Sequence, residues 1–527
     1  MGIAGEGASD ALPCAFAPRA FSGAQHPGKE CSQLCRRGIY ASPSHRCYDG
    51  GMAATETTST HFDVIVLGCG PAGERAAIQA AKAGKRVAVI ERSHVVGGAR
   101  INWGTIPSKT LRESALFVDS LTRNKLHGIR CEIAGEITVA DFMYRERVVV
   151  QRELELANDA LDRYNVEVRR GHGRFTGPHA VAIDPLDGGT AAEITGDVVV
   201  IATGSSPNRP ADVPFDASHV LDSDTVLQVP RLPRSLIVLG AGVVGIEYAS
   251  IFAALGLKVT MVDTRDRLLP FLDREIVAVL KKLLQRRGID IFHDDRHETI
   301  EVEPGNPPRV RCLTKRGLQL EAEALLYCVG RDGNTTDLGL ATIGLVPNHY
   351  GLLAVNENFQ TRHGHIYAVG DVIGYPALAS TSMAQGRQAI RHAFALPGPL
   401  PSTELLPFAI YSIPEVSYIG DTEEAVRKAG VAFVAGRGSY EMNPRGQILG
   451  DTDGLLKMLF EADGGRLRGV HIVGHWASEL IHIGQAWLRS QATAAQIAET
   501  LFNYPTLSDL YRHAANQAVA ELRRLGR

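Results

Sequence analysis

An α/β protein with two separate, mainly parallel sheets is the fold class that this sequence predicts. At two places in the chain a glycine-rich segment lies between a short β-branched strand and a helix, and a further strand then leads to an acidic residue. The chain has 527 residues, of which 45% are hydrophobic, so it is long enough for about three or four domains with cores of their own. Two of these domains are expected to share one strand–helix–strand plan.

The first repeat starts with a predicted strand over residues 63–67, followed by Gly68, Gly70 and Gly73 and an alanine-rich helix. A second strand over residues 86–90 then closes on Glu91. The first glycine permits a tight turn, the second lets backbone N–H groups approach a pyrophosphate, and the third lets helix and strand pack closely. The acid is expected to accept hydrogen bonds from the ribose hydroxyls of a bound dinucleotide.

The second repeat has the same plan: a strand over residues 235–239, then Gly240, Gly242 and Gly245, a helix through residue 254, and a strand over residues 258–262 that closes on Asp263. In both repeats the acid follows the third glycine by 18 residues. One such pattern is weak evidence, but two with equal spacing to an acid predict two Rossmann-type dinucleotide-binding domains. Glycines that served only helix packing would not need the acid. Two dinucleotides on one chain indicate a permanently held FAD and an exchanging nicotinamide nucleotide.

Two further strand ends agree with an FAD site. A predicted strand over residues 197–202 leads to Gly204, and another over residues 366–369 leads to Asp371, whose carboxylate is a candidate partner for the ribityl chain of FAD. Together with the first repeat, they predict an FAD-binding domain built from segments on both sides of an inserted nicotinamide domain.

The second repeat leaves the choice of nicotinamide nucleotide open. Asp263 favours NAD, because a carboxylate repels a 2′-phosphate, yet Arg265 and Arg267 follow within four residues and are candidates to bind that phosphate. The alternative is that both arginines only solvate the turn. If they bind the phosphate, their joint replacement by alanine will weaken NADPH binding much more than NADH binding.

The overall composition is that of an ordinary core-forming protein. The net charge of −3 and the charged fraction of 21% argue against a disordered chain and against a nucleic-acid binder that works by bulk charge. No apolar run approaches the roughly 18 residues of a membrane-spanning helix. The cysteines beyond residue 60 are isolated, which is typical of a reduced, cytoplasmic protein.

The first 60 residues are predicted to be a disordered extension, because they are rich in glycine, serine and alanine and show no helical period. The alternatives are an arginine-bearing targeting segment, or translation that begins at Met52. Cys31, Cys35, His45 and Cys47 do not have the spacing of a standard zinc finger, so no metal site is predicted.

Residues 97–109, with the sequence G-G-A-R-I-N-W-G-T-I-P-S-K, resemble the redox-site segment of the pyridine nucleotide-disulphide oxidoreductases. The resemblance runs from about residue 62 to the C-terminus. It implies an FAD domain over 61–215, an NAD(P) domain over 216–330, a return to the FAD domain over 331–400, and an α+β dimerisation domain over 401–527. A homodimer or larger assembly is therefore expected. The implied FAD contacts are Gly68, Gly70, Gly73, Glu91, Gly97, Gly98, Lys109, Gly204 and Asp371.

The thiol chemistry of that family is missing from the sequence. Disulphide reductases of the family have two cysteines in this segment, at the positions of Arg100 and Thr105, which relay electrons to a disulphide. They also have a histidine and a glutamate near the C-terminus as a thiol general base, where this chain has Tyr504 and Asp509. Two distant parts of the sequence have thus lost the same chemistry.

Within the family, the sequence is most similar to the soluble pyridine nucleotide transhydrogenases, through W-G-T-I-P-S-K at 103–109 and F-N-Y-P-T at 502–506. Such enzymes usually keep a cysteine where this chain has Arg100. A guanidinium there is expected either to raise the potential of the flavin, to bind a phosphate, or to lie solvated at a loop edge.

The resemblance implies a ping-pong reaction in which NADPH gives hydride to flavin N5, NADP⁺ leaves, and NAD⁺ enters the same cleft and takes the hydride. The enzyme's task is then positional. Lys109 and Glu247 are the expected catalytic pair, with the lysine near flavin N5 and the glutamate paired with it beside the nicotinamide. Two alternatives stay open: an NAD(P)H:quinone or dye reductase on the same scaffold, and a non-catalytic redox-sensing flavoprotein.

Overall fold

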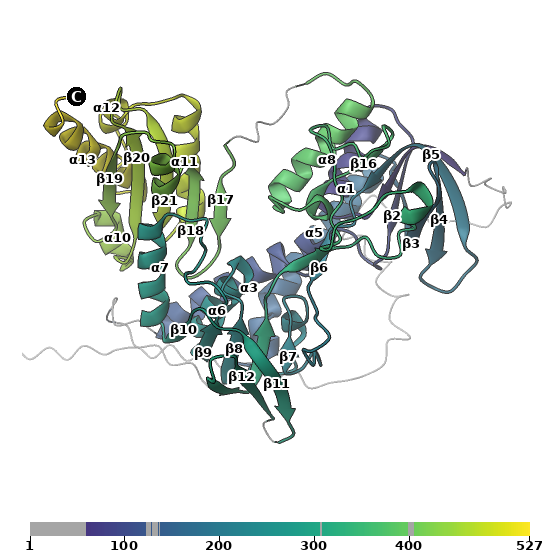
Figure 1. The fold of residues 1–527 in the computed structure, drawn as a ribbon, viewed down its shortest axis with the longest axis horizontal. Coiled ribbons are helices and arrows are strands. Elements are labelled where there is room, and N and C mark those ends of the chain that lie inside the picture. The colour runs from purple at the N-terminus through teal and green to yellow at the C-terminus, as the bar shows by residue number, and fades with distance from the viewer. Residues whose placement is uncertain (1–59, 123–127, 129–134, 136, 306–307, 399–404) are drawn as a thin grey trace, which may run out of the picture. The chain divides into compact units, whose positions relative to one another are not determined.

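The computed structural model describes residues 60–122, 128, 135, 137–305, 308–398 and 405–527 (Figure 1). The predictions for the first 59 residues, including those on Met52 and on the cysteine and histidine group, lie outside this part. From Thr60 onward the described residues belong to one compact unit. None of its helices combines the length and the apolar character needed to cross a bilayer.

The first sheet contains the first repeat and combines distant parts of the chain. Its parallel strands have the order β3, β2, β1, β5, β16, and β4 pairs antiparallel with both β3 and β5. Figure 1 shows β16 and α8, from the later part of the chain, beside β5 and α1. Its elements are β1 (His61–Leu67), α1 (Pro71–Lys82), β2 (Val87–Glu91), β3 (Glu167–Gly177), β4 (Ala180–Pro185), β5 (Ala192–Ile201), β16 (Ile366–Ala368) and α8 (Ala379–Ala393).

The second sheet contains the second repeat and is parallel throughout, in the order β10, β9, β8, β14, β7. A three-stranded antiparallel sheet of β11, β12 and β13 lies between β10 and β14 in sequence. The elements are β7 (Val220–Leu221), β8 (Ser235–Leu239), α6 (Val243–Ala254), β9 (Lys258–Val262), α7 (Arg274–Arg286), β10 (Ile289–Phe292), β11 (His297–Glu303), β12 (Arg309–Thr314), β13 (Gln319–Ala322) and β14 (Ala324–Tyr327).

The structure confirms both repeats and corrects small details. Strands β8 and β9 begin and end where the sequence predicts. Strand β2 begins one residue later than expected and includes Glu91 as its last residue, so this acid ends the strand instead of following it. Strand β5 is longer than predicted, because its first residues pair with β4 in a meander outside the parallel core.

The C-terminal sheet is antiparallel, in the order β17, β18, β21, β20, β19. Along β20, Leu456, Met458 and Phe460 belong to a core shared with α11, α12 and α13, whereas Lys457 faces the opposite side, where α7 packs. The elements are β17 (Phe408–Ile410), β18 (Val416–Gly420), α9 (Glu423–Lys428), β19 (Phe433–Ser439), α10 (Pro444–Leu449), β20 (Leu455–Glu461), β21 (Leu467–Val473), α11 (Ala477–Arg489), α12 (Ala494–Ala498) and α13 (Leu510–Arg524).

The remaining elements connect these sheets. Helix α3 packs against both α5 and α6. Strands β6 and β15 pair antiparallel where the chain passes between the first two sheets. Their bounds are α2 (Gly98–Asn102), α3 (Thr105–Thr122), α4 (Val139–Phe142), α5 (Tyr144–Arg163), β6 (Ser205–Pro207) and β15 (Arg331–Gly333).

Candidate active site

The first glycine of each repeat makes the same turn. Gly68 has φ +95° and Gly240 has φ +96°, a region that L-residues with side chains rarely adopt. A Cβ on Gly68 would lie 2.6 Å from the carbonyl oxygen of Ala202, and one on Gly240 would lie 2.8 Å from that of Cys328. Both glycines therefore pass directly under the neighbouring strand, where a side chain has no room.

The third glycine fixes the helix to its own turn. A Cβ on Gly73 would overlap the carbonyl oxygen of Gly68, and a Cβ on Gly245 would overlap that of Gly240. The backbone contact is thus the same in both repeats, as the equal spacing of the glycines predicts.

The second glycine leaves the start of each helix open. Gly70 and Gly242 precede the first residues of α1 and α6, and in the described structure neither helix start has a side-chain cap. The nearest atoms to a Cβ on these glycines would be the Cα of Gly98 at 3.9 Å and Nη2 of Arg265 at 3.8 Å. Unsatisfied N–H groups and the positive end of the helix dipole are thus available to a phosphate.

The acids at the ends of the two repeats, Glu91 and Asp263, hydrogen-bond to the backbone of the glycine-rich turns. Glu91 accepts hydrogen bonds from the N–H groups of Cys69, at 2.8 Å, and Ser93, at 2.9 Å. Asp263 accepts from the N–H groups of Ala241 and of Arg265, the latter at 2.8 Å. These carboxylates were predicted only as partners of ribose, and their structural role in the turns was not predicted.

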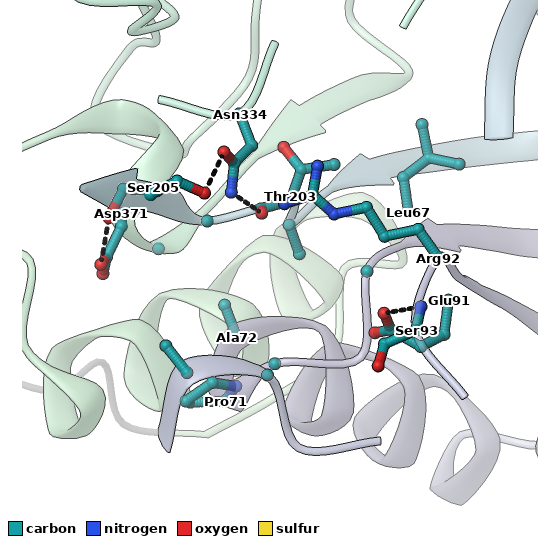
Figure 2. Close-up of a pocket in the computed structure, with 18 of the residues that line it drawn as sticks. Leu67, Pro71, Ala72, Glu91, Arg92, Ser93, Thr203, Ser205, Asn334 and Asp371 are labelled. Atoms are coloured by element: carbon teal, nitrogen blue, oxygen red, sulfur yellow. Dashed lines mark hydrogen bonds between the residues drawn. The ribbon is translucent and has the colours of Figure 1, made fainter. Parts of the chain in front are cut away.

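A cavity of about 540 Å³ opens over the first repeat (Figure 2). Six of the residues predicted to contact FAD line it: Gly68, Gly70, Glu91, Gly98, Gly204 and Asp371. Gly73, Gly97 and Lys109 are not among the lining residues. Gly73 is packed on Gly68, Gly97 faces the side chain of Ile101, and Lys109 turns toward Glu247.

Polar side chains that the sequence analysis missed complete one wall of this cavity. The Ser205 hydroxyl donates to Asp371 at 2.9 Å and accepts from Nε of Arg331 at 2.9 Å, while Asn334 donates to the Thr203 carbonyl at 3.0 Å. The Thr203 hydroxyl is buried and has no hydrogen-bond partner among the described residues. Figure 2 shows Thr203, Ser205, Asn334 and Asp371 together on this wall.

A signal for this wall was present in the repeat. Strand β14 lies beside β8 as β5 lies beside β1, and each of these strands is followed by a glycine with positive φ, Gly204 or Gly330. Ser205 and Arg331 are the residues directly after these two glycines. Comparing the two strand ends would therefore have found both.

Lys109 and Glu247 form the ion pair that the sequence analysis expected. Lys109 lies on α3 and Glu247 on α6, and Nζ donates to Oε2 at 2.8 Å. The carboxylate is buried, and its second oxygen accepts from the backbone N–H of Tyr411 at 2.8 Å. The pair thus joins the helix of the redox-site segment to the second repeat.

Arg100 lines the cavity but is not a solvated residue at a loop edge, so that alternative is wrong. It lies on α2, and Nη2 is 2.9 Å from a carboxylate oxygen of the buried Glu74 on α1. Nη1 is 3.5 Å from Glu153 on α5. An ion-pair network between three helices therefore stands at one of the two positions where disulphide reductases have a cysteine, and Thr105 stands at the other.

The C-terminal positions hold no thiol general base either. Asp509 is bonded by the Arg512 guanidinium at 2.6 and 2.9 Å and lies 3.1 Å from His513. Hydrogen bonds from Arg512, above all, hold the pKa of the Asp509 carboxyl below its ordinary value. Tyr504 is largely exposed in the single chain.

Arg265 and Arg267 differ in where they point. Arg265 donates from Nε and Nη2 to Asp263 at 2.8 and 2.6 Å, across the start of α6. Burial would raise the pKa of Asp263, but the hydrogen bonds from Arg265 lower it, so the carboxylate stays ionised at neutral pH. Arg267 instead donates to the carbonyl of Pro270 at 2.6 Å and points toward Glu424.

Comparisons with known proteins agree with this site. The pyridine nucleotide-disulphide oxidoreductase family matches residues 62–386, and its dimerisation domain matches residues 406–515. The chain belongs to this family. The resemblance seen in the sequence is thereby confirmed, as is the α/β fold class with a C-terminal dimerisation domain, and the protein is an oxidoreductase.

Two relatives are similar to this chain over nearly their whole length. The soluble pyridine nucleotide transhydrogenase of Mycobacterium bovis is 44% identical over 464 residues, which are 88% of this chain and 98% of the relative. That of Chromohalobacter salexigens is 41% identical over 466 residues, covering 87% of this chain and 98% of the relative.

Two solved structures share the fold. LpdA from Mycobacterium tuberculosis aligns with a TM-score of 0.78 and 28% identity, covering 88% of this chain and 99% of the other. The HOCl-induced flavoprotein disulfide reductase RclA from Escherichia coli aligns with a TM-score of 0.77 and 27% identity, covering 86% and 99%.

Proposed function

We propose that the protein is a soluble, FAD-dependent pyridine nucleotide transhydrogenase that moves hydride between NADPH and NAD⁺ in a ping-pong reaction. One observation supports this most strongly: Arg100, paired with Glu74, and Thr105 occupy the two thiol positions, while the Lys109–Glu247 pair is fully formed. With no thiol at either position, a nicotinamide nucleotide is the natural electron acceptor. The names of the relatives agree with this proposal.

The described residues fit FAD. The cavity over the first repeat has an open helix start at Gly70, two carboxylates at Glu91 and Asp371, and the unpartnered, buried hydroxyl of Thr203. An orphaned buried polar group is costly unless a ligand satisfies it. When bound, FAD supplies a two-electron acceptor and donor for hydride. The proposed FAD-binding residues are those that line this cavity, with Gly73 and Gly97 shaping its turns.

The chain's own residues bind and orient the reactants. Lys109, held by Glu247, would supply a positive charge to stabilise the negative charge that hydride transfer develops on a bound flavin. Gly240, Gly242, Gly245 and Asp263 present the open start of α6 and a ribose acceptor to the nicotinamide nucleotide. Arg265 is placed to leave Asp263 for a 2′-phosphate, so that one site accepts both nucleotides.

The proposal includes assembly and location. The match of residues 406–515 to a dimerisation domain supports a homodimer or larger homo-oligomer through the segment 401–527. The domain limits predicted from the sequence and a cytoplasmic location remain parts of the proposal.

The decisive experiment is anaerobic. NADPH is expected to bleach the flavin of the purified protein, and NAD⁺ is expected to restore its colour with stoichiometric formation of NADH. Recovery with a quinone but not with NAD⁺ would support the reductase alternative, and no bleaching would support the redox-sensing module.

A variant tests the assigned pair. Lys109→Met is expected to slow flavin bleaching by roughly 10²-fold, because it removes a preorganised charge from the reacting centre. The exposed Lys282 on α7 is the matched control, and Lys282→Met should leave the rate unchanged. Equal rates in both variants would remove Lys109 from the mechanism.

A further inference from the structure

We propose that Tyr411 of the C-terminal sheet region is a positioning residue of the hydride-transfer site, holding the Lys109 ammonium against Glu247. The inference rests on the role proposed for Lys109. It extends the site to a residue that lies 302 positions away in the sequence and that no motif marks.

Tyr411 contacts both members of the pair. The Lys109 Nζ lies over the Tyr411 ring, 4.9 Å from the ring centroid, within the range of a cation–π interaction. The backbone N–H of Tyr411 donates to Oε1 of Glu247 at 2.8 Å, while Lys109 binds Oε2 at 2.8 Å. The ammonium therefore has a carboxylate on one side and the negative face of an aromatic ring on another.

The segment that carries Tyr411 is fastened to both helices of the pair. On α3, Arg112 donates from Nε to the Ser412 carbonyl at 3.1 Å and pairs with Glu415 at 2.9 Å. On α6, the Ser250 hydroxyl accepts from the N–H of Ile413 at 3.0 Å.

These fastening residues lie where helical geometry requires. Arg112 lies three residues after Lys109, and Ser250 lies three residues after Glu247, so each follows its partner on the same helix face. Arg112, Ser250 and Glu415 are all buried. The backbone that carries the Tyr411 ring is thus held by the same two helices that carry the ion pair.

The Tyr411 phenol is neutral, as a cation–π contact through the ring face requires. Burial, above all, raises the pKa of its phenol, with further contributions from Glu415, Glu479 and Glu247. The ring therefore stays neutral at physiological pH and acts through its face. An aliphatic side chain of similar size would fill the space but would present no negative face to the ammonium.

The test uses the FAD-loaded enzyme and compares Tyr411→Phe with Tyr411→Leu. Tyr411→Phe keeps the ring and the backbone N–H, so bleaching by NADPH is expected within about twofold of the unchanged enzyme. Tyr411→Leu is expected to slow it about tenfold, with FAD content and the thermal midpoint unchanged. Phenylalanines with increasing fluorination at position 411 should give a graded decline, because fluorine weakens the negative face. Equal rates for Leu and Phe, or a flat fluorination series, would overturn the proposal.

A second readout does not depend on turnover. Acetylation of Lys109, followed by peptide mass spectrometry, is expected to be faster in Tyr411→Leu than in Tyr411→Phe, because the amine is less restrained. Unchanged labelling would count against the inference.

Different outcomes would contradict the role proposed for Lys109 and the role proposed for Tyr411. If Lys109→Met does not slow bleaching, the proposed role of Lys109 fails. If Lys109→Met slows it and Tyr411→Leu does not, only the present inference fails. In the double variant, Tyr411→Leu should add nothing to Lys109→Met; additive losses would show that the tyrosine acts elsewhere.

Discussion

In the first repeat, α1 packs against α8 so closely that a Cβ on Gly386 would overlap the carbonyl oxygen of Ala72. The second repeat has a different contact: Asp273 is the N-cap of α7, the helix that follows the repeat, and its carboxylate binds the buried Lys457 of the C-terminal sheet at 2.9 Å. Glu275 and Glu423 bind the same lysine at 3.0 and 2.6 Å.

The two repeats thus share a backbone geometry but differ in the contact that joins each of them to a later part of the chain. Contacts between close-packed backbones do not depend on pH, whereas ion pairs do. The repeat proposed to hold FAD permanently meets α8 through close backbone packing. The repeat proposed to exchange its nucleotide shares an apolar core with the C-terminal sheet, and a buried cluster of charges adds to that contact.

The largest effect is expected from removing the charge of Lys457, which binds Asp273. Lys457→Met should lower the free energy of unfolding by about 3–5 kcal/mol, because it leaves the fully buried Asp273 without its cation. Chemical denaturation at pH 7 measures this loss. FAD content should change less than the affinity for NAD(P)H, because the contact belongs to the second repeat.

The pH dependence provides the control. Burial would raise the pKa values of Asp273, Glu275 and Glu423, but a hydrogen bond from Lys457 lowers all three, and arginines add to this lowering at Glu275 and Glu423. Depressed carboxyl pKa values stabilise the fold above the unfolded-state values and lose that contribution as the pH falls through the folded-state values. The difference between Lys457→Met and the unchanged protein should therefore be full at pH 7 and shrink below about pH 4. A difference that is the same at every pH would mean that packing, not charge, is lost.

Replacing the third glycine of each repeat should affect the binding of a different nucleotide. Gly73→Ala and Gly245→Ala each force a methyl group into a backbone oxygen. We expect each variant to lower the free energy of unfolding by about 1–3 kcal/mol or more. Gly73→Ala should reduce FAD content, and Gly245→Ala should keep FAD but impair bleaching by NADPH. Flavin absorbance per chain and anaerobic bleaching measure both.

Matched controls lie at the ends of the same helices. Gly84 and Gly256 have positive φ but open space around a new Cβ, so alanine there should cost only about 1–2 kcal/mol of backbone strain. Neither control should change the choice of nucleotide. If Gly73→Ala and Gly245→Ala had the same effect on FAD, the proposed division of roles would be wrong.

The smallest effect concerns the choice of nicotinamide nucleotide. Arg265→Ala should raise the KM for NADPH by roughly tenfold and leave that for NADH nearly unchanged, because a charge-assisted hydrogen bond to the 2′-phosphate is lost. Arg267→Ala should change neither by more than about twofold, since its guanidinium is bonded to the Pro270 carbonyl. Steady-state kinetics with both nucleotides decide between them, and equal losses for NADH and NADPH in Arg265→Ala would reject its phosphate role.

Local features of this site were predictable from the sequence. The glycine spacing predicts the contacts of Gly73 with Gly68 and of Gly245 with Gly240, which are local in sequence, and the structure has both. The strands of the second repeat also follow from local pattern. Short-range backbone geometry is decided by residue type, so one sequence is enough to predict it.

The features that were missed depend on distant packing. Arg100 meets Glu74 on another helix, and Arg267 turns to the loop at Pro270 and toward Glu424 instead of staying beside Asp263. Ser205 and Arg331 lie at two strand ends and meet beside Asp371, a residue that was predicted and that comes from a segment far along the chain. No local pattern specifies which partners such side chains find once the sheets have assembled.

Because Arg100, paired with Glu74, stands where disulphide reductases have a cysteine, this position offers no thiol to oxidants or alkylating agents. Among the described residues that line the cavity there is no sulfur atom. The described free cysteines, Cys69, Cys312 and Cys328, do not line the cavity, and burial raises the pKa of each thiol, which suppresses the reactive thiolate. Peroxides, hypochlorous acid and alkylating agents inactivate enzymes that depend on a catalytic thiol. At the position of Arg100 they have a guanidinium and no thiol to attack.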